Sequence, residues 1–345
     1  PYYKYASIYR KISPSQAASK LEDLRIQRPD IAVDALKGRI FYQSNDFDKA
    51  IDAFKKADMS KMEERDVRSF AMAYYLKGKY QESLDVTLKA LDKNGRDAGF
   101  NRLAFFNCTD LQKFDMALDY ADRLFNKSDS AKFSYFDYTY YGNALKGAKK
   151  YNEAEAMYMK ALEQEFDSQD KKAGVIKMLS ETYSAQDKYD EAIKYYEQYL
   201  SEYSTPTATD FAGLPQLYYY KSTILTGDEK VAALTKADEL YAQLGEKFAD
   251  AEEYATFWRA RVNNAKDEDQ KNGYAKPFYE KLIELYSTRT QLSNSDKSRL
   301  KESYLYLISY EARVADDMAK AKENAAKLLE IDPENEVAKQ VMEIK

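Results

Sequence analysis

The chain of 345 residues contains no histidine. This absence excludes Ser-His-Asp and Cys-His nucleophiles, histidine zinc sites and acid-base catalysis by imidazole. The single cysteine, Cys108, excludes an intrachain disulfide and a metal site built from several cysteines. We therefore predict that the protein is not an enzyme, and we expect no cofactor and no metal site.

Glycine and proline are also scarce, with 11 and 7 residues, while 32 residues are tyrosine. This composition favours a helical protein. No run reaches the roughly 18 apolar residues that would cross a bilayer, so we predict no membrane span. A net charge of -5 argues against a nucleic-acid partner, because such partners require concentrated lysine and arginine. The opening segment PYYKYASIYR has the composition of a helix interior, consistent with a leader or a further helix having been removed.

One pattern recurs along the first two hundred residues. It appears in NDFDKAIDAFKKA (45–57), GKYQESLDVTLKAL (78–91), QKFDMALDYADRLF (112–125), KKYNEAEAMYMKAL (149–162) and DKYDEAIKYYEQYL (187–200). An aromatic residue occupies the same place in each segment, at Phe47, Tyr80, Phe114, Tyr151 and Tyr189, with spacings of 33 to 38 residues. A small residue follows three positions later, at Ala50, Ser83, Ala117, Ala154 and Ala192. Further residues at spacings of three and four predict one face of a helix.

A second helix precedes each of these segments. It pairs a small residue with a larger one in Gly38 and Phe41, Ala71 and Tyr74, Gly142 and Leu145, and Ser180 and Tyr183. Each unit is therefore a predicted helical hairpin, whose first and second helices we call helix A and helix B. Because an isolated hairpin cannot bury its apolar face, we expect the hairpins to stack and share a core.

These residues resemble the tetratricopeptide repeat family, and the later part of the chain is similar to repeat proteins of Bacteroidetes-type bacteria. The resemblance implies an all-α, right-handed alpha-alpha superhelix of about eight to nine hairpins, with helix A lining the concave side. It also favours a periplasmic or cell-envelope-associated protein over a cytoplasmic one. Phe105 departs from the pattern because it occupies the small position of the third hairpin.

The predicted organisation is a single solenoid over residues 1–345. Residues 1–30 form an incomplete first repeat, because Ala17, Leu21, Leu24 and Pro29 reproduce the helix B spacing. Regular repeats cover 31–206, and looser repeats cover 207–301. Longer polar connections are predicted at 201–216 and 287–300. Residues 302–345 form the last repeat, which ends in a polar capping helix over 334–345.

Two segments imitate ligand-binding motifs. GNALKGAKK (142–150) lacks the Gly-Lys-Ser/Thr ending of a phosphate loop and follows a predicted helix instead of a strand. KDEDQKNG (266–273) fails the calcium pattern, because Lys271 and Phe278 stand where oxygen ligands are needed. We interpret Cys108 as a buried packing thiol, the usual role of a free cysteine.

We predict that three positions of helix A point into the groove. They are the residue three before the small residue, the residue directly after the small residue, and the residue directly after the aromatic one. This set comprises Arg39, Tyr42, Arg68, Met72, Tyr75, Arg102, Phe106, Asn143, Lys177 and Glu181. Cations beside exposed aromatic rings suit an extended segment that carries carboxylates. The alternative is that these charges pair with neighbouring acids on a solvated face.

The known carboxylate clamp of the family needs Lys and Asn where this chain has Ala35 and Arg39, so that clamp is not predicted. Trp258, with Arg259 and Arg261, is either a second binding centre or part of the core. We predict a non-enzymatic scaffold that binds a peptide segment or a partner protein in the concave groove. The alternative is a structural or assembly subunit that acts through its convex face or self-association. The sequence specifies neither the partner nor the oligomeric state.

Overall fold

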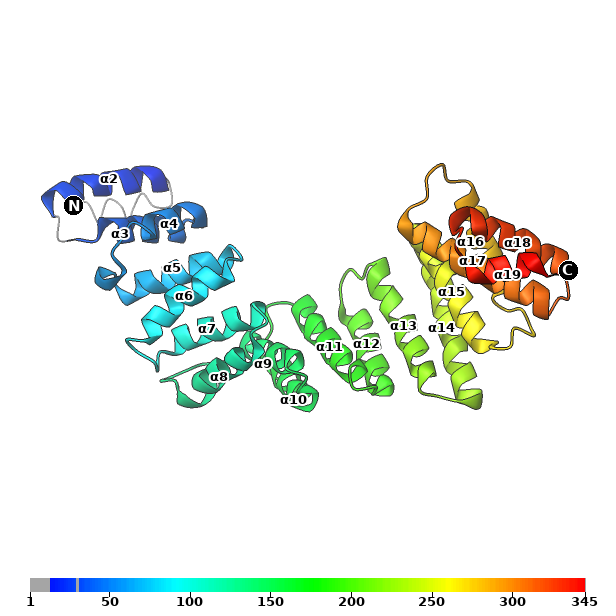
Figure 1. Cartoon of the computed structure of the whole chain (residues 1–345). Coiled ribbons are helices and arrows are strands. Elements are labelled where there is room, and N and C mark those ends of the chain that lie inside the picture. The colour runs from blue at the N-terminus through cyan, green and yellow to red at the C-terminus, as the bar shows by residue number, and fades with distance from the viewer. Residues whose placement is uncertain (1–12, 29–30, 345) are drawn as a thin grey trace. The chain divides into compact units, whose positions relative to one another are not determined.

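The computed structural model describes residues 13–28 and 31–344, and every regular element within these ranges is a helix. The chain divides into two compact units, residues 1–166 (unit 1) and residues 167–345 (unit 2). In each unit the helices follow one another side by side in chain order (Figure 1). The all-α solenoid of hairpins is confirmed, whereas one continuous solenoid over 1–345 stays a prediction. Pro29, part of the predicted incomplete repeat, lies outside the described residues.

Within its described residues, unit 1 has one leading helix and four hairpins. Its helices are α2 (Pro14–Gln27), α3 (Val33–Gln43), α4 (Phe47–Phe54), α5 (Glu64–Leu76), α6 (Tyr80–Leu91), α7 (Ala98–Asp110), α8 (Phe114–Asp122), α9 (Tyr135–Gly147) and α10 (Tyr151–Leu162). A 3-10 helix (Met59–Lys61) precedes α5, and a π-helix (Arg123–Lys127) continues α8. Successive A helices touch, since α3 contacts α5, α5 contacts α7 and α7 contacts α9.

Unit 2 contains four hairpins and a closing helix. Its helices are α11 (Gln169–Ser184), α12 (Tyr189–Glu202), α13 (Ala208–Thr223), α14 (Gly227–Lys247), α15 (Glu252–Lys266), α16 (Lys276–Ser287), α17 (Asn294–Arg313), α18 (Met318–Ile331) and α19 (Glu336–Glu343). A 3-10 helix (Ala249–Ala251) lies between α14 and α15. Each helix packs against the next one along the chain.

The repeated aromatic residue is the first residue of helix B in all five regular hairpins, at the starts of α4, α6, α8, α10 and α12. The residue two positions before it has a left-handed backbone in every case, at Asn45, Gly78, Gln112, Lys149 and Asp187. The next backbone N–H then donates to a carbonyl of helix A, as Asp46 does to Phe41 at 2.9 Å. This is the hydrogen bond that closes a Schellman turn. The same turn therefore joins the two helices in the four hairpins of unit 1 and in the first hairpin of unit 2.

Small residues bring the two helices of a hairpin into contact, as the sequence predicts. The small residues of helix B, from Ala50 to Ala192, are all fully buried. In α11 the hydroxyl of Ser180 donates to the carbonyl oxygen of Ala192 at 2.6 Å, which places side chain against backbone. Larger side chains at these positions would separate helix A from helix B.

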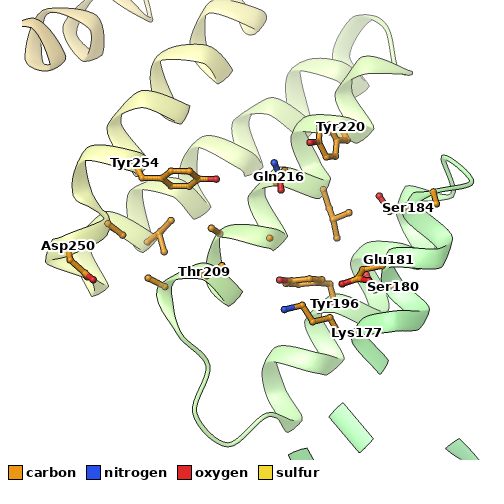
Figure 2. A pocket seen from close by; sticks show the side chains of 17 residues that line it. Lys177, Ser180, Glu181, Ser184, Tyr196, Thr209, Gln216, Tyr220, Asp250 and Tyr254 are labelled. Atoms are coloured by element: carbon orange, nitrogen blue, oxygen red, sulfur yellow. The ribbon is translucent and has the colours of Figure 1, made fainter. Parts of the chain in front are cut away.

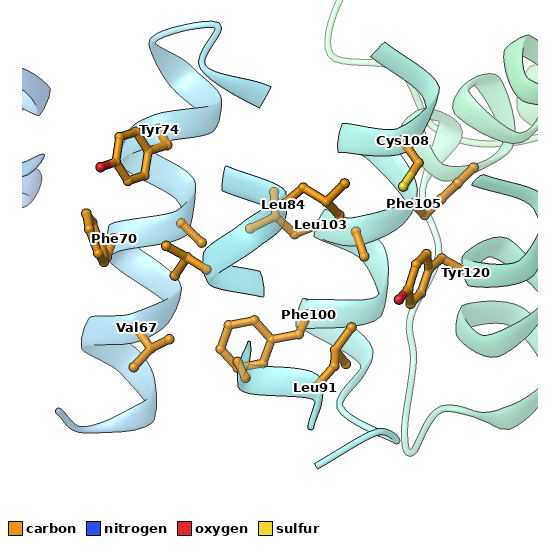
Figure 3. Close-up of a cluster of buried hydrophobic side chains, with 14 of the residues drawn as sticks. Val67, Phe70, Tyr74, Leu84, Leu91, Phe100, Leu103, Phe105, Cys108 and Tyr120 are labelled. Carbon is orange, nitrogen blue, oxygen red and sulfur yellow. The ribbon is translucent and has the colours of Figure 1, made fainter. Parts of the chain in front are cut away.

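The core of unit 1 runs between the hairpins (Figure 3). Phe54 of α4 packs against Phe70 of α5, with ring centroids 5.3 Å apart. Phe105, the exception at the small position, is fully buried, and its ring makes edge contacts with Tyr140 and Tyr141 of α9. The bulky residue is thus accommodated between neighbouring A helices.

The predicted long polar connections are shorter in the structure, and this prediction was wrong. Residues 208–216 belong to α13, because Thr207 and Asp210 form a capping box that begins the helix before Pro215. Ser293 and Asp296 form a second capping box that begins α17 at Asn294, eight residues before the predicted start of the last repeat.

The predicted capping helix is present as α19, but its outer surface is not uniformly polar. Ala338 and Val341 face inward and are buried. Val337 and Met342 are exposed.

Replacing a contact glycine should destabilise the stack. A Cβ atom on Gly142 would lie 2.5 Å from the buried ring of Tyr158, whose hydroxyl is fixed to Asn143 at 2.7 Å. Overpacking lowers the free energy of unfolding by about 1–3 kcal/mol. The higher helix propensity of alanine raises it by about 1 kcal/mol. Gly142→Ala should therefore lower the free energy of unfolding by up to about 2 kcal/mol. Urea denaturation measures this change.

The matched control is Gly174→Ala in α11, where an added Cβ meets no atom within 4 Å. Here only the helix-propensity gain remains, so stability should rise by up to about 1 kcal/mol. Equal shifts in the two variants would contradict the close packing of the glycine against the ring.

Candidate functional site

The ten residues predicted to line a groove all lie on helix A of a hairpin. Unit 1 carries Arg39 and Tyr42 on α3, Arg68, Met72 and Tyr75 on α5, Arg102 and Phe106 on α7, and Asn143 on α9. Unit 2 carries Lys177 and Glu181 on α11. Their role in partner binding stays a prediction, and their surroundings differ between the units.

Cations on one helix A pair with acids at the start of the next. Arg39 of α3 donates to both carboxylate oxygens of Asp66, the third residue of α5, and both side chains are buried. Arg68 of α5 lies 2.9 Å from Asp97, the residue that caps α7. An acid at a helix N-terminus also interacts favourably with the helix dipole.

The same arrangement recurs further along the chain. Nε of Arg102 on α7 lies 2.5 Å from Oδ1 of Asp137, the third residue of α9. In unit 2, Nζ of Lys177 on α11 lies 2.9 Å from Oδ1 of Asp210, the third residue of α13. The equivalent cations noticed in the sequence thus connect adjacent hairpins. The expectation of a carboxylate-bearing partner rested on these cations, and each one already faces an acid of the protein.

Aromatic residues fill the helix A surface of unit 1. The hydroxyls of Tyr75 and Tyr140 lie 2.6 Å apart, and the ring of Phe106 stacks on Tyr140 with centroids 4.0 Å apart. Asp110 accepts a hydrogen bond from Tyr140 at 3.3 Å. Burial raises the pKa of Tyr140 to about 12. The structure therefore unites two predicted residues with Tyr140 and Asp110, which the sequence pattern had not marked.

A shallow hollow of about 430 Å³ elsewhere in unit 1 is lined by Tyr42, Arg68 and Met72, which belong to the predicted set. Exposed Glu64 and Arg65 of α5 also line it. The remaining unit 1 residue, Asn143, accepts the hydroxyl hydrogen of Tyr158 within its own hairpin. It is therefore part of the packing between α9 and α10.

A hollow in unit 2 has a volume of about 720 Å³ (Figure 2). Lys177, Glu181 and Ser184 of α11 line one side, and Asp250 and Tyr254 line another. Helix α13 crosses between them and contributes Thr209, Gln216 and Tyr220. Tyr196, Leu217 and Leu244 supply larger apolar contacts. The pocket thus spans the A helices of three successive hairpins.

Small side chains on α13 create this space. Ala208, Ala212 and Gly213 all line the pocket, and their spacings of four and five place them on one side of the helix. At Gly213 a Cβ atom would lie 2.1 Å from the hydroxyl oxygen of Tyr196, so no larger residue fits beside that ring. In unit 1 the helix A surface carries stacked rings, whereas here it is hollow.

Asp210 anchors the wall of the pocket next to α11. Its Oδ1 accepts hydrogen bonds from Lys177 at 2.9 Å and from the Tyr199 hydroxyl at 2.6 Å. Its Oδ2 accepts from the backbone and hydroxyl of Thr207. Burial alone would raise the pKa of Asp210, but these hydrogen bonds outweigh it and hold the pKa well below the ordinary value. The carboxylate stays ionised and keeps the charge of Lys177 engaged.

The predicted set contains only Lys177 and Glu181 of the residues that line the pocket, and it misses Gln216, Tyr220, Asp250 and Tyr254 among others. The groove prediction counts from the small residue of helix A, and the sequence had placed Gln216 in the polar connection at 201–216 instead of in a helix. The capping box at Thr207 and the small residues that follow it are the signals that locate α13.

Trp258 belongs to an aromatic cluster in unit 2. Its ring stacks on Tyr241 with centroids 5.8 Å apart and meets Tyr219 edge-on at 5.4 Å. Arg259 and Arg261 are each held through two hydrogen bonds by a carboxylate of another helix. These contacts are those of core packing.

The single cysteine lies in the core of unit 1. Cys108 is fully buried, as predicted, and burial raises the pKa of its thiol to about 11. Across residues 13–28 and 31–344, no group of three or more acids and cysteines is placed to hold a metal ion. None of the helices within those ranges is both long and apolar enough to span a membrane.

Comparison with known proteins agrees with this architecture. Models of the tetratricopeptide repeat match residues 35–61 and residues 176–206. The chain is similar to the solved C-terminal part of a TPR repeat-containing protein from Cytophaga hutchinsonii, with 24% identity, a TM-score of 0.66, and coverage of 80% of this chain and 100% of that one. It is also similar to a tetratricopeptide repeat protein from Parabacteroides merdae, with 14% identity, a TM-score of 0.45, and coverage of 69% and 93%. Cytophaga hutchinsonii belongs to the Bacteroidetes. No curated protein matches the chain.

Loss of the Asp210 carboxylate should destabilise unit 2. Asp210→Asn leaves Lys177 without its partner in a partly buried setting, and such a loss costs roughly 2–4 kcal/mol. Because the folded-state pKa is lowered, the stabilisation is complete at neutral pH and declines as the pH falls below the ordinary value of 3.8. Urea unfolding of both proteins between pH 7 and pH 3 measures the difference.

Asp190→Asn is the control, because its ion pair with Lys221 lies at the surface and Asp190 is 79% exposed. Such pairs contribute little, so the control should unfold like the wild type. If both variants lose the same stability, the structural role assigned to Asp210 is wrong.

Proposed function

We propose that this protein, whose hairpins are tetratricopeptide repeats, is a non-catalytic scaffold that binds an extended segment of a partner protein at the unit 2 pocket. Tetratricopeptide repeats are generally protein-interaction modules. The binding surface consists of the A helices α11, α13 and α15. The hollow of about 720 Å³ across these helices is the observation that carries the proposal.

The composition of the pocket supports peptide binding. Apolar surface from Ala212, Leu217 and Leu244 lies beside the polar side chains of Gln216 and Thr209. Binding sites commonly combine an apolar interior with a few placed polar groups that fix orientation. The volume of about 720 Å³ suits one or two side chains of a segment that continues along the A helices.

The alternative, an assembly subunit acting through its outer surface, has less support. Each described B helix from α4 to α18 carries at most one exposed large apolar residue: Met116 on α8, Met159 on α10, Val231 on α14 and Leu285 on α16. Isolated exposed apolar side chains are normal on protein surfaces, whereas an interaction surface needs a contiguous patch. The helix A surface of unit 2 is therefore the better candidate.

Filling the pocket tests the proposal. Ala212→Phe adds a ring to the hollow lined by α13, so capture of the natural partner should fall at least about tenfold, equivalent to about 1.4 kcal/mol. Tagged wild-type and variant chains are used as bait in extracts of the source cell, and bound proteins are quantified by mass spectrometry. Thermal melting followed by circular dichroism verifies that the variant folds.

Ala232→Phe is the matched control, since Ala232 is exposed on α14 and does not line the pocket. It should retain the same bound proteins as the wild type. Recovery of the same partners at equal yield with folded Ala212→Phe would contradict binding at this pocket.

A further inference from the structure

We infer that the unit 2 pocket accepts a basic side chain, lysine or arginine, from the partner segment. This inference rests on the proposed function and specifies the chemistry of the partner. It reverses the sign of charge expected from the sequence, because the pocket presents carboxylates and tyrosine rings while its one cation is already engaged.

The charges of the lining favour a cation. Lys177 is the sole basic residue among those that line the pocket, and its Nζ is hydrogen-bonded to Asp210. Two acids, Glu181 and Asp250, line the same pocket and are both exposed. Asp250 forms no ion pair with any described residue. An incoming carboxylate would be repelled by Asp250, whereas an ammonium or guanidinium group would be attracted to it.

The two acids lie on different sides of the pocket. Figure 2 shows Glu181 on α11 and Asp250 beside the start of α15, with α13 between them. A basic side chain that enters the pocket from solvent therefore has a carboxylate on each side of it. Opposite charges placed across a binding surface improve both specificity and the rate of association.

Tyrosine rings complete the recognition. Tyr220 and Tyr254 line the pocket, and Figure 2 shows the ring of Tyr254 extending towards α13. A cation within about 6 Å of a tyrosine ring face gains roughly 0.5–2 kcal/mol. The apolar surface of Leu217 and Leu244 suits the aliphatic stem of the same side chain. The aliphatic stem and the charged head of the basic side chain thus each have a complementary surface in the pocket.

Selection from random peptides tests the inference. Phage displaying random 12-residue peptides are selected on the immobilised full chain, and enriched sequences are synthesised with a fluorescein label. We expect lysine or arginine beside an apolar residue in the enriched peptides. Fluorescence anisotropy should then show at least about tenfold weaker binding to the Glu181→Lys, Asp250→Lys double variant.

The control double variant is Glu191→Lys, Glu197→Lys, which makes the same charge change at exposed positions of α12 outside the pocket. Its affinity should stay within about twofold of the wild type. If the Lys-substituted pocket fails to fold, as judged by circular dichroism, Glu181→Gln and Asp250→Asn replace it. Each neutral variant should then weaken binding about threefold.

The outcomes separate the two proposals. Enrichment of acidic or uncharged peptides, or equal affinity for the wild type and the pocket variants, overturns the inference and leaves peptide binding intact. If no peptide is enriched on the wild-type chain, peptide binding itself fails, and the inference fails with it.

Discussion

The fold depends on aromatic side chains of helix B that pack between two A helices. Phe54 shows the arrangement most clearly, because its ring lies against Gly38 of its own hairpin and against Phe70 of the following one. In unit 2, Tyr196 of α12 likewise contacts the following hairpin, where it lies against Gly213 and donates a hydrogen bond to the carbonyl oxygen of Asp210. A hairpin alone would leave these rings half exposed, so each hairpin gains its core from a neighbour.

Charge reinforces this packing and shapes the binding surface. The ion pairs from Arg39 to Asp66 and from Lys177 to Asp210 join successive A helices, and each acid also lies at a helix N-terminus. The cations that a partner would otherwise contact are therefore engaged in holding the stack together. A binding site therefore requires a place where the helix A surface departs from this regular pattern of filled and paired side chains. The small residues of α13 provide such a place in unit 2.

Much of the fold could be predicted from the sequence, because stacking imposes a periodic requirement on side-chain size. The aromatic residues from Phe47 to Tyr189 begin helix B where the pattern placed them. The later hairpins were harder, since Pro215 and the run of small polar residues around it are typical of a loop. The capping box at Thr207 begins a helix there despite the proline.

The candidate site could be predicted only in part. Lys177 and Glu181 line the pocket because their positions on helix A follow from the repeat. The engagement of Lys177 by Asp210 could not be predicted, since the two residues meet only when adjacent hairpins pack. Asp250 and Tyr254 lie just after α14, whose 21 residues exceed the length of the regular B helices. The period of the first five hairpins therefore no longer locates them.

Hydrogen exchange followed by mass spectrometry tests the central claim that neighbouring hairpins supply one another's core. Phe54→Ala removes the ring that packs between α3 and α5 while leaving the second hairpin's own sequence unchanged. Peptides from residues 64–91 should then exchange faster than in the wild type, together with those from 33–54. Wild-type exchange in residues 64–91, with loss of protection confined to 33–54, would contradict the account.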